Sequence, residues 1–419
     1  MLWRNADFLR LWGGKTASSV GDRVSALAVP TAAILLLHAD ALHVGLLYVC
    51  FYLPYPLLAL PAGVVVDRIP RRPLLVACDL GRFVAVLSIP ITAAVGHLAL
   101  VQLYAVGLAQ GALGTFFEVA YRAYLPGLVG PEGLVEGNSR LEASDAAAQT
   151  VGPGLGGLLI QLLTAPTAIL VDAFSFVISA AGLMRIRRVE ARHEAPADTG
   201  AGFVSELREG IAALARHPVI RWTAACVATN NCGLMMTRTV FLLFAYQVLH
   251  LAPLAVGAML LLQGLAGLAG AAAAPAVEHR LGTGPTLAAS IGGESLGWAL
   301  LPLAMVAPAL PIAVVSMLLA GFCGPIWNVT NVSLRQSLVP ARLQGRIHAS
   351  NLAIAFGTIP LGALAGGWLA GALEHAVGYG PGLALTLATG GVIGIAAVGW
   401  VLARPVRTLR LRPAVQATL

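Results

Sequence analysis

Residues 61–75 read PAGVVVDRIPRRPLL and directly follow an apolar run over residues 44–60. One aspartate and three arginines fall within six positions of this stretch: Asp67, Arg68, Arg71 and Arg72. A long apolar helix that ends in a basic cluster has left a membrane on the side where cationic loops collect. The stretch therefore predicts a membrane-spanning helix, a short cytoplasmic loop and the start of a second span.

The composition of the whole chain agrees with this interpretation. Of 419 residues, 58% are hydrophobic and only 11% are charged, and the mean hydropathy is +0.82. Such a chain is too apolar for an ordinary soluble protein, which predicts an all-α, multi-pass membrane protein. The start of the chain, residues 1–15, lacks the pattern of a cleavable signal peptide.

Apolar stretches of roughly twenty residues recur along the chain and predict about twelve transmembrane helices. Their expected centres are Ala28, Tyr52, Val86, Gly107, Leu155, Phe176, Thr237, Leu262, Leu296, Val315, Leu361 and Val392. We expect these helices to form two pseudo-symmetric six-helix bundles.

The charges in the connections predict the topology. Arginines follow the even-numbered helices, whereas the connections after odd-numbered helices contain no lysine or arginine: residues 38–43, 96–99, 163–166, 250–253, 307–311 and 374–381. By the positive-inside rule both termini are cytoplasmic, and we expect a bacterial plasma (inner) membrane protein. Because the net charge of +7 is sorted by topology and forms no patch, we expect no nucleic-acid partner.

The two halves of the chain resemble each other at an offset of about 210 residues. His38-Ala-Asp-Ala-Leu-His-Val-Gly45 matches His250-Leu-Ala-Pro-Leu-Ala-Val-Gly257, one of four such matches in the same order. This repeat predicts an N-terminal bundle over residues 1–186, a cytoplasmic linker over 187–216, and a C-terminal bundle with a short tail over 217–419. We expect the protein to act as a monomer.

The spacing of Gly63, Asp67, Arg68, Arg71 and Arg72 resembles G-x-x-x-D-R-x-x-R-R, the loop signature of the major facilitator superfamily. Pro70 departs from it, because the superfamily pattern has a glycine there. The resemblance implies a cytoplasmic gate: Gly63 would let a neighbouring helix approach, and Asp67 would face a helix N-terminus near Gly345 and Arg346. Taken singly, the three arginines are also compatible with an ordinary basic loop.

A second motif lies in the predicted fifth helix, where residues 152–157 read GPGLGG. Gly152, Pro153, Gly156 and Gly157 resemble the core of the antiporter motif, which marks exporters more than importers in the superfamily. Its upstream glycines are absent here. A proline among close glycines gives a bend and a flat helix face, which serves either sliding between helices or simple close packing.

The first helix carries the most unusual charges. If it enters the membrane near Phe8, Asp22 lies about 20 Å deep, where an ionisable group needs a partner or water. Lys15 shares its face, whereas Arg23 points about 100° away. Asp22 is thus a candidate proton or substrate site; the alternative is a pair with an arginine that only holds helices together.

Further charged residues lie within the predicted helices. Asp172 and Arg238 are the candidates for a cavity, with Arg23 and Arg238 expected to tune the carboxylates or contact anionic cargo. Several others were assigned less specific roles or none: Glu118 with Arg122 as a structural pair, Asp145, Asp79 and Arg82 near helix ends, and Glu294.

The opening residues 5–30 together with CDLGRF and VDAFSFVISA resemble one branch of the superfamily, which contains drug, macrolide and siderophore exporters and a lysophospholipid transporter. The resemblance implies no enzyme but a secondary transporter that exports a small amphipathic drug or secondary metabolite by alternating access, driven by protons. Its partners would be the substrate, protons and the lipid bilayer. The alternatives are a lipid or lysolipid flippase of the same fold and a polytopic membrane enzyme. The five cysteines lack metal spacing, and we expect no cofactor and no metal.

Overall fold

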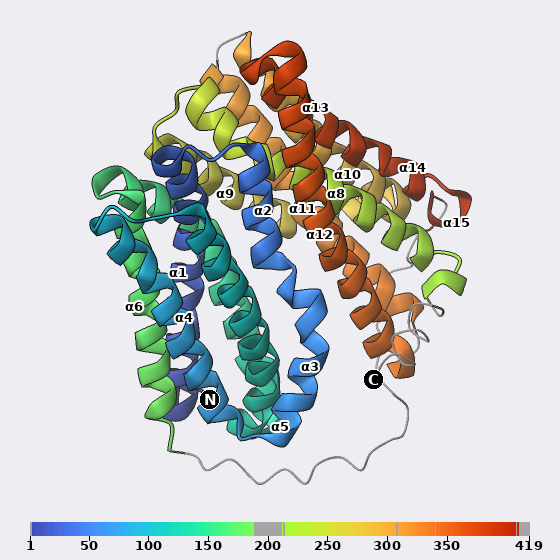
Figure 1. The fold of residues 1–419 in the computed structure, drawn as a ribbon. Helices are drawn as coiled ribbons and strands as arrows, with labels where there is room; N and C mark the ends of the chain where they lie inside the picture. Colours follow the sequence, from blue (N-terminus) through green and yellow to red (C-terminus); the bar gives the residue numbers. More distant parts are fainter. Residues whose placement is uncertain are drawn as a thin grey trace. The chain divides into compact units, whose positions relative to one another are not determined.

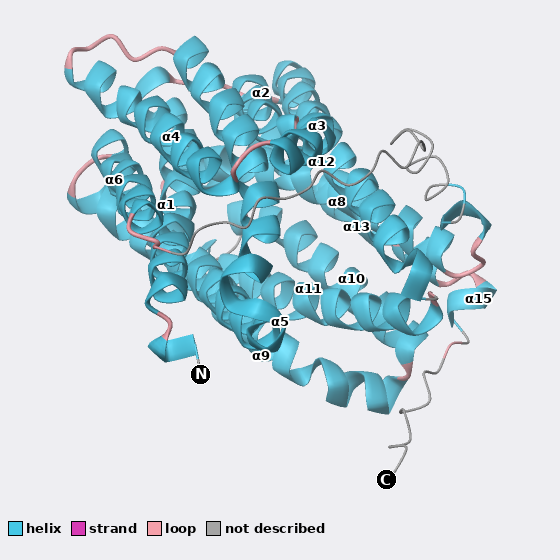
Figure 2. Ribbon diagram, turned by 90° about the horizontal axis from the view of Figure 1, so that it is seen from below, coloured by secondary structure: helices cyan, strands magenta, loops and turns pink. Residues whose placement is uncertain are grey.

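The computed structural model describes residues 2–187, 212, 214–306, 309–339, 341–407 and 409. Within those ranges the chain forms helices joined by short loops, and no strand occurs among them (Figures 1 and 2). The all-α prediction is therefore confirmed. The predicted linker, apart from a few residues at its ends, lies outside the described residues.

The first half of the chain contains one short 3-10 helix, η1 (Leu2–Arg4), and six long or medium helices (Figure 1). These are α1 (Ala6–Leu37), α2 (Ala41–Tyr52), α3 (Pro54–Arg68), α4 (Arg71–Ala94), α5 (Leu100–Leu162) and α6 (Ala165–Met184). Asn5 begins α1 as its N-cap, since its side-chain oxygen accepts hydrogen bonds from the backbone N–H groups of Asp7 and Phe8 at 3.1 and 3.0 Å.

Among the described residues, the second half contains six long helices and several short ones. They are α8 (Ile220–Leu243), η2 (Phe244–Val248), α9 (Pro253–Leu281), α10 (Thr283–Leu300), η3 (Leu301–Met305), α11 (Ala309–Leu338), α12 (Ala341–Val377), α13 (Tyr379–Ala396), α14 (Val398–Val401) and α15 (Arg404–Arg407). Each of the twelve predicted helix centres falls within a helix of the structure.

Ten helical segments of the described chain are long and apolar enough to cross a membrane. One of them, α5, has 63 residues and would be about 95 Å long if straight, about three times the hydrocarbon thickness. It bends at Gly130, where φ is +73° and ψ is 170°, and so contains two spans. With α8 as a further 24-residue helix, the approximate count of twelve agrees with the structure.

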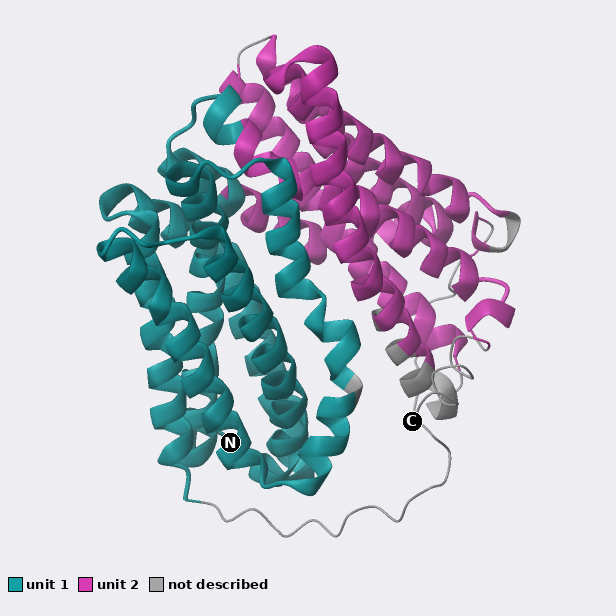
Figure 3. Cartoon of the chain, viewed as in Figure 1, with its two compact units in different colours: residues 1–200, 245–261 teal, residues 201–244, 262–419 magenta. Residues whose placement is uncertain are grey.

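The chain forms two compact units (Figure 3). Unit 1 comprises residues 1–200 and 245–261, and unit 2 comprises residues 201–244 and 262–419. The domain limits expected from the sequence, at residues 186 and 217, stay predictions.

The sequence repeat has a structural counterpart at one turn. His38 and His250 both have a left-handed backbone, with φ of +51° and +50°. The following N–H closes the same hydrogen bond in each copy, Ala39 to the carbonyl of Ala33 and Leu251 to that of Ala245, both at 2.9 Å. Residues that are 212 positions apart in the two copies of the repeat thus share backbone geometry as well as sequence similarity.

Within unit 1, glycines bring α1 and α6 close together. A Cβ added at Gly14 would lie 2.9 Å from the Ser179 Cα, and one at Gly21 would lie 2.9 Å from the Asp172 Cα and 2.6 Å from its Oδ1. No Cβ fits at these separations, so the small residues set the helix spacing. This close approach buries the Asp172 carboxyl directly against α1.

Candidate ion and substrate sites

Arg82 of α4 is the centre of a polar cluster in unit 1. Its Nη2 donates to Oδ1 of Asp22 on α1 at 2.5 Å, and its Nε donates to Oε1 of Gln110 on α5 at 2.9 Å. Its guanidinium also lies 4.1 Å from the ring centroid of Phe176 on α6. The side chain of Arg82 is 9% exposed and that of Asp22 is 37% exposed. One buried cation thereby joins four helices, with its carboxylate partner reachable from outside.

Two further carboxyls lie within electrostatic reach of the Asp22–Arg82 pair. Asp79 of α4 and Asp172 of α6 are both fully buried. Neither carboxylate oxygen of Asp79, nor Oδ2 of Asp172, has a hydrogen-bond partner among the described residues. Such groups are costly to bury and are retained where they exchange a proton or a ligand. No set of three or more His, Cys, Asp and Glu side chains able to hold a metal ion occurs in the described chain.

The structure brings Asp22 and Asp172 within electrostatic reach of each other, but not of Arg23. Arg23 is exposed, and Arg82 is the guanidinium that pairs with Asp22. Arg82 had been placed near a helix end by sequence reasoning, and that placement is wrong. It lies eleven residues after the start of α4, about 16 Å along the helix. Its spacing of three from Asp79, one helical turn inside an apolar run, was the available signal.

A second group of charged residues in unit 1, formed by Lys15, Glu118 and Arg122, holds helices together. Glu118 accepts a hydrogen bond from the Arg122 Nε at 2.9 Å, which confirms the predicted pair. Its other oxygen lies 3.2 Å from the Lys15 Nζ. Lys15 also lies over the rings of Phe117 and Tyr121, 5.5 and 5.4 Å from their centroids. Lys15 therefore links α1 to α5. Asp22 lies on the same face of α1 but pairs with Arg82 of α4.

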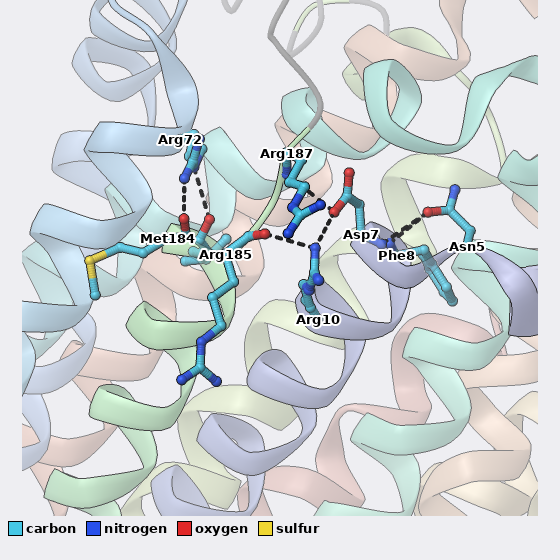
Figure 4. Close-up of polar contacts among 9 residues, drawn as sticks. Asn5, Asp7, Phe8, Arg10, Arg72, Met184, Arg185 and Arg187 are labelled. Carbon is cyan, nitrogen blue, oxygen red and sulfur yellow. Dashed lines mark hydrogen bonds and ion pairs between the residues drawn. The ribbon is translucent and has the colours of Figure 1, made fainter.

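The arginines of the loop signature bind helix carbonyls. Arg71 donates to the carbonyl of Ala123 in α5 at 3.0 Å. Arg72 donates from Nε to the Leu183 carbonyl at 2.9 Å and from Nη2 to that of Met184, the last residues of α6 (Figure 4). A cation at a helix C-terminus satisfies free carbonyls and the helix dipole. These two arginines therefore attach the loop to the neighbouring helices α5 and α6.

The remaining positions of the signature are exposed or open. Asp67 and Arg68 are exposed. A Cβ added at Gly63 would meet nothing within 4 Å, and the approach of another helix there stays a prediction. The turn contains only Ile69 and Pro70, with Pro70 as the residue that precedes α4, a position that proline's fixed φ favours. The side chains of Gly345 and Arg346 lie outside the described residues.

The same C-terminal end of α6 is also held by the N-terminal residues of α1. Arg10 Nη1 lies 2.7 Å from Oδ1 of Asp7 and also donates to the carbonyl of Arg185 at 2.7 Å, while the Arg187 N–H donates to Asp7 at 3.2 Å (Figure 4). Like Arg72, Arg10 thus binds a carbonyl at the C-terminal end of α6.

The glycines of the antiporter-like motif allow close contacts on two sides of α5. Gly152 packs against the Cβ of Arg23, and an added Cβ at Gly156 would lie 3.4 Å from the Val24 Cα, both on α1. An added Cβ at Gly157 would lie 2.6 Å from the carbonyl oxygen of Pro253 and 2.7 Å from the Cα of Gly257, at the start of α9. Pro153 lies within the helix between these contacts. The motif therefore gives α5 a thin face, that is, a face of small residues that neighbouring helices approach closely, as its composition predicts.

Unit 2 has its own polar cluster, around Glu294 of α10. Ser295 Oγ donates to Oδ1 of Asn230 on α8 at 3.1 Å, and the Asn230 side chain also interacts with the Glu294 carboxylate. Arg238, also on α8, is exposed. The cluster surrounds a small cavity whose other wall is formed by glycines of α13. Sequence reasoning noted Glu294 but assigned it no role.

The sequence that forms these helices, the signature loop and the intramembrane charges can be compared with the sequences of known families. Residues 11–353 match the sequence model of the Major Facilitator Superfamily. The chain belongs to this superfamily.

Two relatives show how far the similarity extends. The multidrug efflux pump Tap of Mycolicibacterium fortuitum is 28% identical over 387 residues, covering 90% of this chain and 92% of that protein. An uncharacterised MFS-type transporter of Bacillus subtilis, YfiS, is 30% identical over 222 residues, 52% of each chain.

Solved structures of the superfamily share the fold. A bacterial homologue of the iron transporter ferroportin, in an inward-facing state, has a TM-score of 0.74 at 17% identity and covers 96% of this chain and all of its own. A bacterial homologue of the human lysosomal transporter Spinster has a TM-score of 0.75 at 14% identity, covering 97% and 98%. The chain is thus a multi-pass membrane transporter with the superfamily fold.

Proposed function

We propose that this transporter exports small amphipathic compounds, drugs or secondary metabolites, in exchange for protons. The observation that carries the proposal is the similarity to a multidrug efflux pump over nine tenths of both chains. The thin face of α5 at Gly152, Gly156 and Gly157 supports the direction, since the motif it resembles is typical of exporters.

Proton coupling would use the cluster of unit 1. Asp22, Asp79 and Asp172 surround one guanidinium, so the cluster is electrically neutral when one carboxyl is ionised and two carry protons. Each proton gained or lost changes the charge that Arg82 balances in a medium of low dielectric constant. Asp22 is the half-exposed member, and we assign it the exchange with water.

A gate and an orientation in the membrane belong to the same proposal. Asp67, exposed at the end of α3, would form the cytoplasmic gate on a loop that Arg71 and Arg72 hold in place. We place the protein in the bacterial inner membrane as a monomer, with both termini cytoplasmic and one six-helix bundle on each side of the linker.

A lipid or lysolipid flippase is the second candidate. It is favoured by Arg23 and Arg238, two exposed guanidiniums inside apolar helices, because arginine binds phosphate oxygens with bidentate geometry. In a flippase one or the other of these side chains, rather than Asp22, would contact the headgroup.

The test is accumulation of fluorescent dyes and drugs in an efflux-deficient bacterial host that expresses the chain, with and without a protonophore. Wild type should exclude at least one cationic dye, and the protonophore should abolish the exclusion. Asp22→Asn should lose it, whereas Glu132→Gln, at an exposed carboxylate, should keep it. Correctly inserted wild type that excludes no compound, but moves a labelled lysolipid, would replace export by the flippase.

A further inference from the structure

The cluster of unit 2 occupies the position that corresponds to Arg82 in unit 1. The 212-residue offset that relates His38 to His250 takes Arg82 to Glu294 and carries α4 onto α10. Arg82 reaches α1, and Glu294 reaches α8, the corresponding helix. Equivalent places in the two halves thus hold a guanidinium in one and a carboxylate in the other, and the proposed proton exchange uses only the first.

The oxygen atoms around Glu294 come from two helices. Besides its carboxylate, α10 supplies the Ser295 hydroxyl, and α8 supplies the Asn230 carbonyl and the Thr237 hydroxyl. Among the described residues, Asn230 Oδ1 accepts one hydrogen bond, from Ser295 at 3.1 Å, and Thr237 Oγ1 donates to the Gly233 carbonyl at 3.0 Å. Both oxygens keep a free lone pair.

The space between these oxygens is small. The centre of a water molecule could occupy about 10 Å³ of this cavity, so the cavity holds roughly one water-sized occupant. Gly390, Gly391 and Gly394 of α13 form one wall, and Trp298 forms another. Gly324 of α11 leaves room for the carboxylate, since an added Cβ would lie 2.9 Å from Oε1 of Glu294. The cavity is therefore too small for a drug-sized molecule.

A carboxylate, an amide carbonyl and two hydroxyls around a water-sized space are oxygen ligands of the kind that hard cations take. The single carboxylate matches a single positive charge. We propose that this cavity binds a small monovalent cation, either a free alkali-metal ion such as Na⁺ or the primary ammonium head of a bound amine.

The charged and titratable groups near Glu294 are few. Arg238 and Cys226 on α8 and Cys323 on α11 interact with it electrostatically, and of these only Arg238 carries a full positive charge. The positive charge of Arg238 interacts with the Glu294 carboxylate and therefore opposes a cation bound beside it. Removing the Arg238 charge should therefore raise the affinity for a cation, whereas removing the Glu294 charge should lower it.

The site goes beyond the proposed export and can be tested without any cargo. Purified full-length protein in detergent would be titrated with ²²Na⁺ and, separately, with labelled methylammonium. Wild type should bind at least one of them saturably, and Glu294→Gln should lose that binding. Asn230→Ala should weaken it about tenfold. Arg238→Gln should lower the Kd. The matched control is Glu374→Gln, an exposed carboxylate of the same unit, which should bind like wild type.

The pattern of binding assigns the source of the cation. Saturable, Glu294-dependent Na⁺ binding assigns a free ion, and such binding of methylammonium alone assigns the ammonium head of a cargo. Saturable binding of neither ion by monodisperse wild type overturns the site. Should Glu294→Gln aggregate, Arg238→Gln decides, because unchanged or weaker binding in that variant contradicts a cation beside Glu294.

Discussion

At the scale of single residues, the side chains of unit 1 divide between structural and exchangeable roles according to how completely they are paired. Arg82 is paired on three sides, by a carboxylate, an amide and an aromatic ring. Asp79 has no hydrogen bond to any described residue although it is fully buried. Breaking a buried pair by removing one partner costs more than the pair itself contributes, because the other charge is left in low dielectric. The fully paired cation and the half-exposed carboxylate should therefore respond differently to substitution.

Arg82→Gln should destabilise the protein strongly, by about 3 kcal/mol, because the ionised carboxylate of the cluster then lacks its buried cation. Asp22→Asn should cost much less, since Asp22 is 37% exposed and water can replace part of the interaction. The measurement is the apparent melting temperature of the purified variants in detergent. Arg23→Gln is the matched control at an exposed arginine and should melt like wild type. Equal melting temperatures for Arg82→Gln and Arg23→Gln would rule out the assigned pairing.

At the scale of helices, the antiporter-like segment of α5 combines tight and ordinary contacts in adjacent positions. Gly157 meets backbone atoms of α9, whereas Gly156 faces α1 at van der Waals distance. Backbone atoms cannot easily move away, so an added Cβ is tolerated at the separation found for Gly156 but not at that found for Gly157. The two neighbouring glycines thus provide a matched pair for testing how closely helices must approach.

Gly157→Ala should impair both stability and transport, because its Cβ would lie 2.6 Å from the Pro253 oxygen and 2.7 Å from the Gly257 Cα. Gly156→Ala should be tolerated, since its nearest contact would be 3.4 Å. Dye efflux at equal membrane abundance measures the effect on transport, and the melting temperature measures the effect on stability. Efflux by Gly157→Ala at the level of Gly156→Ala would show that the contact with α9 is dispensable.

Hydropathy predicted where the helices lie, but not which of their side chains meet. All twelve centres fall in helices, with Tyr52 at the point where Leu53 and Pro54 divide the second span into α2 and α3. Period and composition are local properties, and they do not show which helices become neighbours. The partner of Asp22 was therefore missed, because Arg82 lies 60 positions away.

At the scale of the whole molecule, the charge distribution of the connections predicts one orientation. Arginines such as Arg71 and Arg72 bind the ends of helices on one side, while the loop at residues 96–99 carries no lysine or arginine. Positive loops are retained in the cytoplasm. The same orientation determines the direction in which a proton gradient can act on the carboxyls of unit 1.

Alkaline phosphatase, which folds only outside the cytoplasm, reports this orientation. Inserted after His97, it should be active, and inserted after Gly200, it should be inactive. The control is a green fluorescent protein at the same two sites, which should give the opposite pattern. Activity at Gly200 together with inactivity at His97 would reverse the predicted topology.

The central claim is that proton flow through the Asp22–Arg82 cluster drives movement of an amphipathic cation. The most direct measurement is uptake of ethidium into proteoliposomes that contain purified protein and DNA, with and without an acidic interior. Wild type should accumulate ethidium only when the interior is acidic, because outward proton flow then drives exchange, and Asp22→Asn should not respond to the gradient. Uptake by wild type that is the same with and without the gradient, or gradient-driven uptake that survives in Asp22→Asn, would contradict the account.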